Sequence, residues 1–215
     1  MAEEIRSVVS TYIYQGRVAS SNEVHARDYA NDPRYATFFP NFPELIGHNI
    51  ALYSYRGYSE ASDAESSSKW NPKEIEIVEN LLRRLLASNV DMHNVVVIAM
   101  YDLQVRGLKE TITGMGEHFQ NVTVASVYSF QGKESDVVIL SLVRSNQRHD
   151  IGFMRDARRV IVAMSRTRDY LLIVGNFGSL HGSGVPTFTD LFNLLDHRGV
   201  HMTNFSNAHW RPCYF

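Results

Sequence analysis

Five short apolar runs, rich in Val and Ile, recur along the chain and predict buried β-strands. Segments with apolar residues at helical spacing lie between most of them. Strands that alternate with helices are typical of a parallel sheet joined by right-handed crossovers. The sequence therefore predicts an α/β fold with helices on both faces of a parallel sheet, whose strands lie near Ile50–Tyr55, Val95–Ala99, 122–127, 137–142 and 170–175.

The clearest helix signal begins at Asn71, which suits the N-cap position, followed by Pro72 at the first helical position. Glu74 is placed to reach back to the cap, as in a capping box. Apolar residues then follow helical spacing until Ser88-Asn89 end the helix. Further helices are predicted at Leu103–Phe119, near 156–165 and at Thr187–His197, and Met1–Tyr14 reads as a helix end running into a strand.

The remaining segments have no sustained period. Ser20–Glu44 is polar and aromatic, and we interpret it as a long surface excursion. Ser59–Ser68 is an acidic-serine linker that is too polar to pack. We therefore expect the domain to start at 1–19, an irregular insertion with one strand and the linker at 20–68, the core at 69–199 and a tail at 200–215.

Composition narrows the function classes. The 215 residues carry a net charge of −2, so any binding of a polyanion must come from a local patch. The single cysteine, Cys213, excludes an internal disulfide and a CxxC site, and the nine histidines form no HxH or HExxH spacing. We expect no metal site. No apolar run is long enough to span a bilayer, which favours a soluble protein of the cytoplasm or nucleus without membrane association.

The loop between the third and fourth predicted strands carries the first candidate chemistry. It follows a strand of a parallel sheet, so we expect it at the carboxyl edge, where such sheets bind ligands. Gly132 permits close backbone approach, Gln131 and Glu134 offer acceptors for a ribose or base, and Lys133 suits a phosphate. The alternative is a polar turn in which Gly132 only supplies a special backbone angle.

A basic patch follows. Seven of the chain's 21 Lys and Arg residues lie in the 25 positions from Arg144 to Arg168. Arg159 and Arg166 are two helical turns apart, so both can project from one face and grip a transferring phosphoryl group. The alternative is a solvated helix face paired with carboxylates. The chain has no GxxxxGK[ST] and no GxGxxG, so it lacks the loop that cradles the β- and γ-phosphates.

The stretches VASVYSFQGKESDVVILSLVRSN and IGFMRDARRVIVAMSRTR…LLIVGN resemble motifs V and VI of superfamily 1 helicases. The nearest groups are the nonsense-mediated-decay RNA helicase, senataxin and aquarius. Tyr14-Gln15-Gly16 is similar to the YEG of motif IV, Asn71-Pro72 with Glu74 to the family's NPxE helix start, and Ile98–Gln104 to its TPY segment. The resemblance implies the second, C-terminal RecA-like domain of such a helicase, a P-loop NTPase-type fold without the phosphate loop.

The resemblance also implies roles for single residues. Arg166 matches the motif VI arginine that reaches the γ-phosphate, as the catalytic residue, and Glu134 faces the ribose. ATP with Mg²⁺ would lie between this domain and an N-terminal RecA-like domain, in cis or trans, that supplies the metal ligands. The implied nucleotide-binding residues are Gln131, Gly132, Lys133, Glu134, Arg159 and Arg166, and those implied for single-stranded RNA or DNA are Tyr101, Ser129, Arg144, Ser145 and Asn146.

Some positions depart from the family pattern. Tyr128 replaces the usual aspartate of VDSFQG, Ile161 replaces the common asparagine of RLNVALTR, and Ala99-Met100 replaces the Thr-Pro of the TPY segment. The start, Met1–Ile5, resembles the tail of the family's QYRMHPEI. We expect half of an ATP-dependent helicase that does not hydrolyse ATP alone. Two alternatives are a non-catalytic module that binds RNA or a helicase, and an unrelated nucleotide-binding α/β enzyme such as a transferase.

Overall fold

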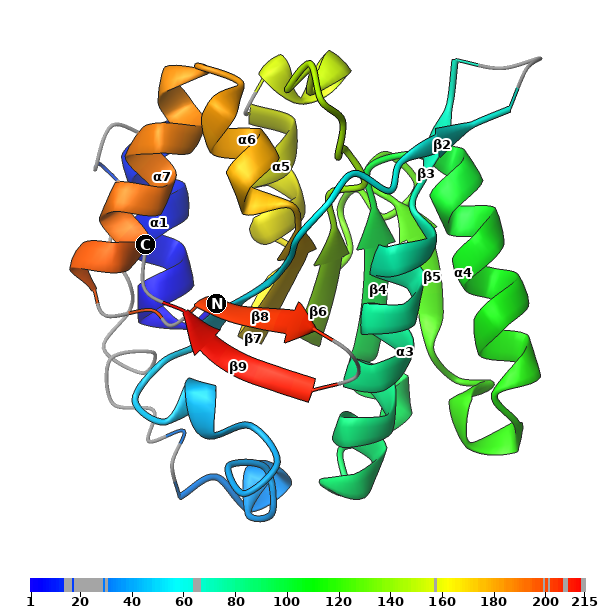
Figure 1. Ribbon diagram of the computed structural model, residues 1–215. Coiled ribbons are helices and arrows are strands. Elements are labelled where there is room, and N and C mark those ends of the chain that lie inside the picture. Colours follow the sequence, from blue (N-terminus) through cyan, green and yellow to red (C-terminus); the bar gives the residue numbers. More distant parts are fainter. Residues whose placement is uncertain are drawn as a thin grey trace.

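A seven-stranded sheet forms the centre of the molecule in the computed structural model (Figure 1). The structure describes residues 1–13, 17, 29, 31–63, 67–156, 158–198, 200, 202–206 and 209–213. The strand order is β5-β4-β6-β7-β1-β8-β9, and every neighbouring pair is parallel except β8 with β9. The strands are β1 (Ile50–Tyr55), β4 (Val95–Ala99), β5 (Thr123–Ser126), β6 (Ser135–Ser141), β7 (Thr167–Gly175), β8 (Met202–Ser206) and β9 (His209–Cys213).

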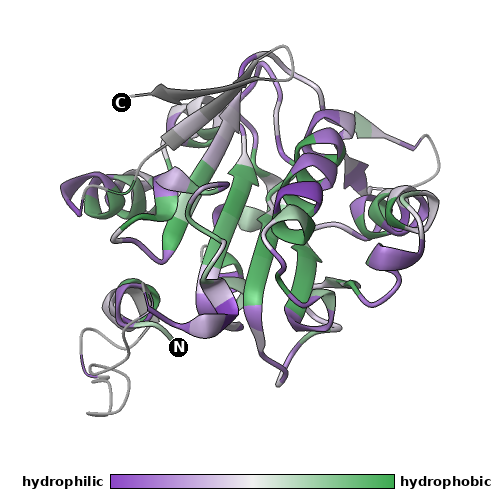
Figure 2. Ribbon diagram, turned by 90° about the horizontal axis from the view of Figure 1, so that it is seen from below, coloured by the Kyte–Doolittle hydropathy of each residue, from purple (hydrophilic) through white to green (hydrophobic). Residues whose placement is uncertain are grey.

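The helices cover both faces of this sheet, as the sequence predicted, because side chains alternate between the faces along each strand. Ile50 and Leu52 of β1 point into one core, whereas Ala51 and Tyr53 point into the other. The strands at the middle of the sheet are accordingly apolar (Figure 2). The first core contains α1 (Glu3–Ile13), α5 (Arg158–Met164), α6 (Phe177–Gly182) and α7 (Pro186–His197), and the second contains α3 (Pro72–Ala87) and α4 (Asp102–Gly114).

Short elements complete the described part of the chain. A two-stranded antiparallel ribbon stands apart from the main sheet at one end of it (Figure 1). No helix in the described residues is long and apolar enough to cross a membrane. The short elements are the ribbon strands β2 (Ala61–Ser62) and β3 (Lys69–Trp70) and the 3₁₀ turns Pro33–Tyr35, Pro43–Leu45, Met92–Asn94, Glu117–Phe119 and Gly152–Arg155.

Three expectations about the less regular segments were wrong. The first residues form a single helix, α1, whose Ile5 and Val8 are fully buried against the sheet, rather than a helix that runs into a strand. In the described part of Ser20–Glu44, Phe38 and Phe42 are also fully buried and stack at 4.6 Å. The expected tail contains β8, which pairs parallel with β1, and β9. These elements lack a periodic pattern of their own, so only their packing partners reveal them.

The start of α3 is partly as predicted. Asn71 caps the helix, since its side-chain oxygen accepts from the backbone N–H of Lys73 and Glu74 at 3.1 and 3.2 Å. The capping box is wrong: the backbone N–H of Asn71 donates instead to the side chain of Gln104 at 2.7 Å. The Glu74 carboxylate turns away into the protein and accepts from the hydroxyls of Tyr55 and Ser141.

This capping region holds a strained turn at the end of β6. Val143 has a φ of 74°, a left-handed value that a β-branched residue adopts only under constraint. The N–H of Arg144 donates to the carbonyl of Leu142 at 2.9 Å, which closes a γ-turn over Val143. Strain of this kind costs roughly 1–3 kcal/mol and persists where the surroundings impose it.

Both peptide groups of Val143 are held by fully buried side chains. Its N–H donates to Glu74 Oε2 at 2.9 Å, and its carbonyl accepts from Asn71 Nδ2 at 2.8 Å. We call Asn71 and Glu74 the Val143 clamp. The clamp directs the chain sideways from the carboxyl edge of the sheet, so it sets the position of the segment from Arg144 to Asp150.

The clamp should make stability depend on pH. Burial raises the pKa of Glu74 from its ordinary value to about 7, although four hydrogen bonds oppose the shift. Folding therefore favours the neutral acid. This stabilisation is complete below the pKa of the unfolded chain and is lost as the pH rises through about 7.

We therefore expect the wild-type free energy of unfolding to fall relative to that of Glu74→Gln between about pH 5 and pH 8, by up to about 3 kcal/mol. The amide keeps the shape of the side chain and does not ionise. Urea unfolding at several pH values measures the difference, and parallel pH profiles for the two proteins would exclude the effect.

A second pair of variants separates the cap from the clamp. Asn71→Ser keeps an N-cap oxygen but loses the donor to Val143, so it should lower the free energy of unfolding by about 1–3 kcal/mol. Asn71→Ala loses both functions and should cost about 1 kcal/mol more. Equal stability of the serine variant and the wild type in chemical denaturation would show that the bond to Val143 contributes nothing.

Candidate functional site

The loop from β5 to β6 crosses one face of the sheet from edge to edge. Because β5 and β6 are both parallel to β4, the end of β5 and the start of β6 lie at opposite edges. The seven residues of β6 set these edges about 20 Å apart. Val127 and Phe130 anchor the crossing in the first core. The expectation that the whole loop lies at the carboxyl edge is therefore wrong, since only its first half does.

The first half of this loop is a tight turn at the carboxyl edge. The hydroxyl of Ser129 accepts from the backbone N–H of Ser126 at 2.9 Å, and the N–H of Phe130 donates to the Ser126 carbonyl at 3.1 Å. Gly132 has a φ of 79°, and no atom lies within 4 Å of the place where a side chain would begin. Its glycine is thus required by backbone conformation rather than by crowding.

The second half of the loop reaches the amino edge, where Glu134 and Arg166 lie on adjacent backbone segments. The N–H of Ser135 donates to the carbonyl of Arg166 at 3.0 Å. The half-exposed Glu134 carboxylate contacts Arg168 at 3.2 Å. Gln131, Gly132 and Lys133, which precede Glu134 in the loop, are exposed as well.

The side chain of Arg166 has a different kind of hydrogen-bond partner from the other arginines near this edge. Its guanidinium contacts the hydroxyl of Ser165 at 2.8 Å and the carbonyl of Val162 at 3.2 Å. It forms no ion pair with any carboxylate in the described part of the chain, whereas Arg168 pairs with Glu134 and Arg34 pairs with the buried Asp169. The positive charge of Arg166, held by two neutral acceptors, is consequently not neutralised within the domain.

The structure does not bring Arg159 and Arg166 together. Arg159 lies in α5, at the end near the carboxyl edge, with its guanidinium carbon 5.1 Å from the ring centre of Phe153. Arg166 follows the last residue of α5 and precedes β7 at the amino edge. The length of α5 separates them, because Arg159 lies at the start of this helix and Arg166 lies after its end. The nucleotide role predicted for Arg159 therefore rests on the sequence alone.

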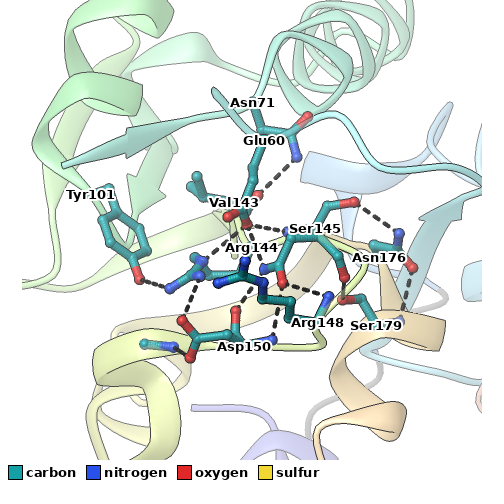
Figure 3. Close-up of polar contacts among 12 residues, drawn as sticks. Glu60, Asn71, Tyr101, Val143, Arg144, Ser145, Arg148, Asp150, Asn176 and Ser179 are labelled. Atoms are coloured by element: carbon teal, nitrogen blue, oxygen red, sulfur yellow. Dashed lines mark hydrogen bonds and ion pairs between the residues drawn. The ribbon is translucent and has the colours of Figure 1, made fainter. Parts of the chain in front are cut away.

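Arg144 is the centre of a polar network at the carboxyl edge (Figure 3). Its guanidinium bonds Glu60 at 2.9 Å, the hydroxyl of Tyr101 at 3.3 Å and Asp150 at 3.2 Å, while only 7% of its side chain is exposed. Any side chain at Gly152 would clash with this guanidinium. Arg144 is therefore a buried cation whose donors are used inside the domain.

The two residues that follow Arg144 extend the same network. The N–H of Ser145 donates to Glu60 at 2.7 Å, and its buried hydroxyl accepts from Asn176 at 2.8 Å. Asn146 donates to Glu60 and to the Asp150 carbonyl, and is only partly buried. Arg144 and Ser145 thus support the edge, whereas Asn146 lies at its surface. The predicted nucleic-acid contacts of all three stay predictions.

Sequence reasoning missed Glu60, Asn176 and Gln104. Glu60 accepts from three consecutive residues, Arg144 to Asn146, although it lies in the segment interpreted as an unpacked linker. Its partners are more than 80 positions away, so no local pattern could reveal it. Asn176 does carry a signal, because it follows an apolar strand and caps α6. The similarity of Tyr14-Gln15-Gly16 to motif IV lies outside the described residues.

The donor set at the amino edge fits part of a nucleotide site. Arg166, Lys133 and Arg168 suit phosphate oxygens, and Glu134 suits a ribose hydroxyl. The described residues contain no group of three or more His, Cys, Asp or Glu side chains that could hold a metal ion. The sequence also has no GxxxxGK[ST] phosphate loop.

The chain is similar to several known proteins. A family model described as an AAA domain, AAA_12, matches residues 1–178. The DNA polymerase alpha-associated DNA helicase A of Saccharomyces cerevisiae is 41% identical over 54% of this chain and 17% of its own length. DNA-binding protein SMUBP-2 of Rattus norvegicus is 34% identical over 63% of this chain and 14% of its own. A Neurospora crassa homolog of regulator of nonsense transcripts 1 is 38% identical over 64% and 12%.

The chain thus spans less than a fifth of the length of these three relatives. The family match covers α1, the parallel strands β1 and β4 to β7, and both edges described above. The chain belongs to the AAA_12 family, and it is a C-terminal RecA-like domain of the superfamily 1 helicases.

Proposed function

We propose that this chain is the C-terminal half of the motor of an ATP-dependent RNA or DNA helicase. Its amino edge would form one wall of an ATP site, and its carboxyl edge one wall of a track for a single strand. A second RecA-like domain would supply the phosphate loop and the ligands of Mg²⁺. The observation that supports this most is the unneutralised guanidinium of Arg166 beside Glu134.

At the nucleotide, Arg166 would bind oxygens of the γ-phosphoryl group. A guanidinium without an internal carboxylate partner keeps its full charge for a phosphate, and it presents donors in a planar fork that matches phosphate oxygens. Glu134 would accept from a ribose hydroxyl after exchanging its half-exposed contact with Arg168 for the sugar. Such an exposed pair is worth little, so the exchange costs little. Gln131, Gly132 and Lys133 would line the same wall.

The proposed cycle follows from the position of the site between two domains. Binding of ATP with Mg²⁺ draws the domains together because both contact the same phosphates, and hydrolysis releases that contact. Closure and opening then move the two walls of the strand track relative to each other. Contacts along this track would be mainly to phosphate and sugar, so they would carry little sequence specificity. We propose that the protein acts in the cytoplasm or the nucleus.

One observation favours a second candidate, a non-catalytic module that binds RNA or a helicase partner. Each guanidinium nitrogen of Arg144 already bonds a group of the domain, Glu60, Tyr101 or Asp150, which argues against one predicted strand contact. Such a module would bind single-stranded RNA or a protein partner without any dependence on ATP. Separate binding measurements with labelled ATP and labelled single-stranded RNA distinguish it from the motor.

The chain alone should show no ATP hydrolysis above background, with or without single-stranded RNA or DNA. Arg166 can act only on a phosphate that another element holds in place. A phosphate-release assay with the purified 215-residue chain measures this. Nucleic-acid-stimulated turnover by this chain would contradict the shared site.

When the chain is joined to an N-terminal RecA-like domain of a relative, Arg166→Ala should lower the hydrolysis rate by on the order of 10³–10⁵. Binding of ATP should change little, since the arginine acts mainly on charge that develops in the transition state. Arg158→Ala is the matched control, because it removes an equal charge from the other end of α5, where Arg158 pairs with Asp156 at 2.8 Å. Equal losses in both variants would remove Arg166 from the catalytic role.

A further inference from the structure

A cavity of about 240 Å³ opens at the carboxyl edge, above the ends of β4 and β5. It is distinct from the amino-edge wall assigned to ATP. Its lining combines three aromatic rings, one guanidinium and small polar groups. The principal lining residues are Tyr101, Asp102, Ser126, Tyr128, Phe153 and Arg159.

Tyr128 is the unusual member of this lining. Its side chain is 60% exposed, among the most exposed large apolar side chains of the described chain. The turn that carries it is rigid, because hydrogen bonds link Ser126 with Ser129 and the Tyr128 carbonyl with the N–H of Gln131. A ring that is 60% exposed gains little burial within the domain, so its free face is available to a ligand.

Arg159 lies between this ring and a second one. Its guanidinium carbon is 5.9 Å from the ring centre of Tyr128 and 5.1 Å from that of Phe153. Phe153 packs edge-on against Tyr101 at 4.5 Å, which fixes the floor of the cavity. The contact of Arg159 with Asp156 is long, at 3.9 Å, and both groups are exposed, so it neutralises little of the charge.

A second cavity of about 490 Å³ is lined by the basic Lys69, Arg144 and Arg148 together with Asn146 and the acidic Glu60 and Asp150. The bond between the Tyr101 hydroxyl, in the first cavity, and Arg144, in the second, joins the two. Arg148 is exposed and forms no ion pair with a described carboxylate. An aromatic and guanidinium platform therefore adjoins free positive charge, the combination that binds one base and the phosphates next to it.

We propose that Tyr128 and Arg159 form a stacking site for one base of a single-stranded nucleic acid. The inference rests on the proposed function and adds to it a contact with a base, where the other expected contacts are to phosphate and sugar. The ring of Tyr128 stacks on one face of the base, and the guanidinium of Arg159 lies over the edge of the same platform. Because every base has a flat π face, the site takes any base and holds the register of the strand rather than its sequence.

Affinity for two labelled single strands tests the site with the full chain. One strand is an oligothymidylate of about 12 nucleotides, and the other has the same backbone length without bases. Tyr128→Ala should weaken binding of the oligothymidylate by about 5- to 100-fold and leave the abasic strand unchanged. Tyr128→Phe should retain the wild-type affinities, since it keeps the ring. Fluorescence anisotropy gives both constants, and thermal unfolding shows that the exposed substitutions leave the fold intact.

Arg148→Ala is the matched control for charge. It should weaken both strands by the same factor and reduce the salt dependence, because a phosphate contact does not distinguish a base from its absence. Unchanged or equal losses on the two strands in Tyr128→Ala would overturn the stacking site while the strand track survives. Failure of the wild-type chain to bind either strand would overturn both the track and this site.

Discussion

The arrangement of the functional edges depends on a buried polar contact, the Val143 clamp. Asn71 and Glu74 begin α3 and at the same time hold both peptide groups of a strained valine at the end of β6. One pair of side chains thus connects the start of α3 with strand β6 and with the segment that follows β6. Because both side chains are fully buried, leaving either one without its partner would cost more free energy than one hydrogen bond contributes on net. The clamp therefore leaves one conformation for the carboxyl edge.

Two elements connect that edge with the amino edge. The loop between β5 and β6 starts beside Tyr128 and ends at Glu134, and α5 starts near Arg159 and leads to Arg166. Both cross the same face and are anchored in the same core. In the proposed motor, a displacement at the phosphates is consequently passed to the strand track by two rigid, parallel connections.

Charge pairing sorts the arginines of the basic patch, which look alike in the sequence. Arg144 is neutralised inside the domain, and Arg158 is paired at the surface. Among the described residues, Arg166 contacts only neutral acceptors, whereas Arg159 contacts aromatic rings and one distant carboxylate. The alternative interpretation, a solvated helix face whose arginines pair with carboxylates, therefore applies to some of these residues and not to others. The useful distinction is whether a guanidinium keeps its charge for a partner outside the domain.

The sequence by itself determined the α/β architecture, because strands buried on both faces are continuous apolar runs and the capping signal at Asn71 is local. The bounds of β1 and β4 agree with the predicted ones for the same reason. The tertiary structure alone decided the partners of Glu74 and Glu60, the strands in the expected tail and the separation of Arg159 from Arg166. These depend on contacts between residues far apart in the chain, and a carboxylate or an arginine in the sequence does not show which group will face it after folding.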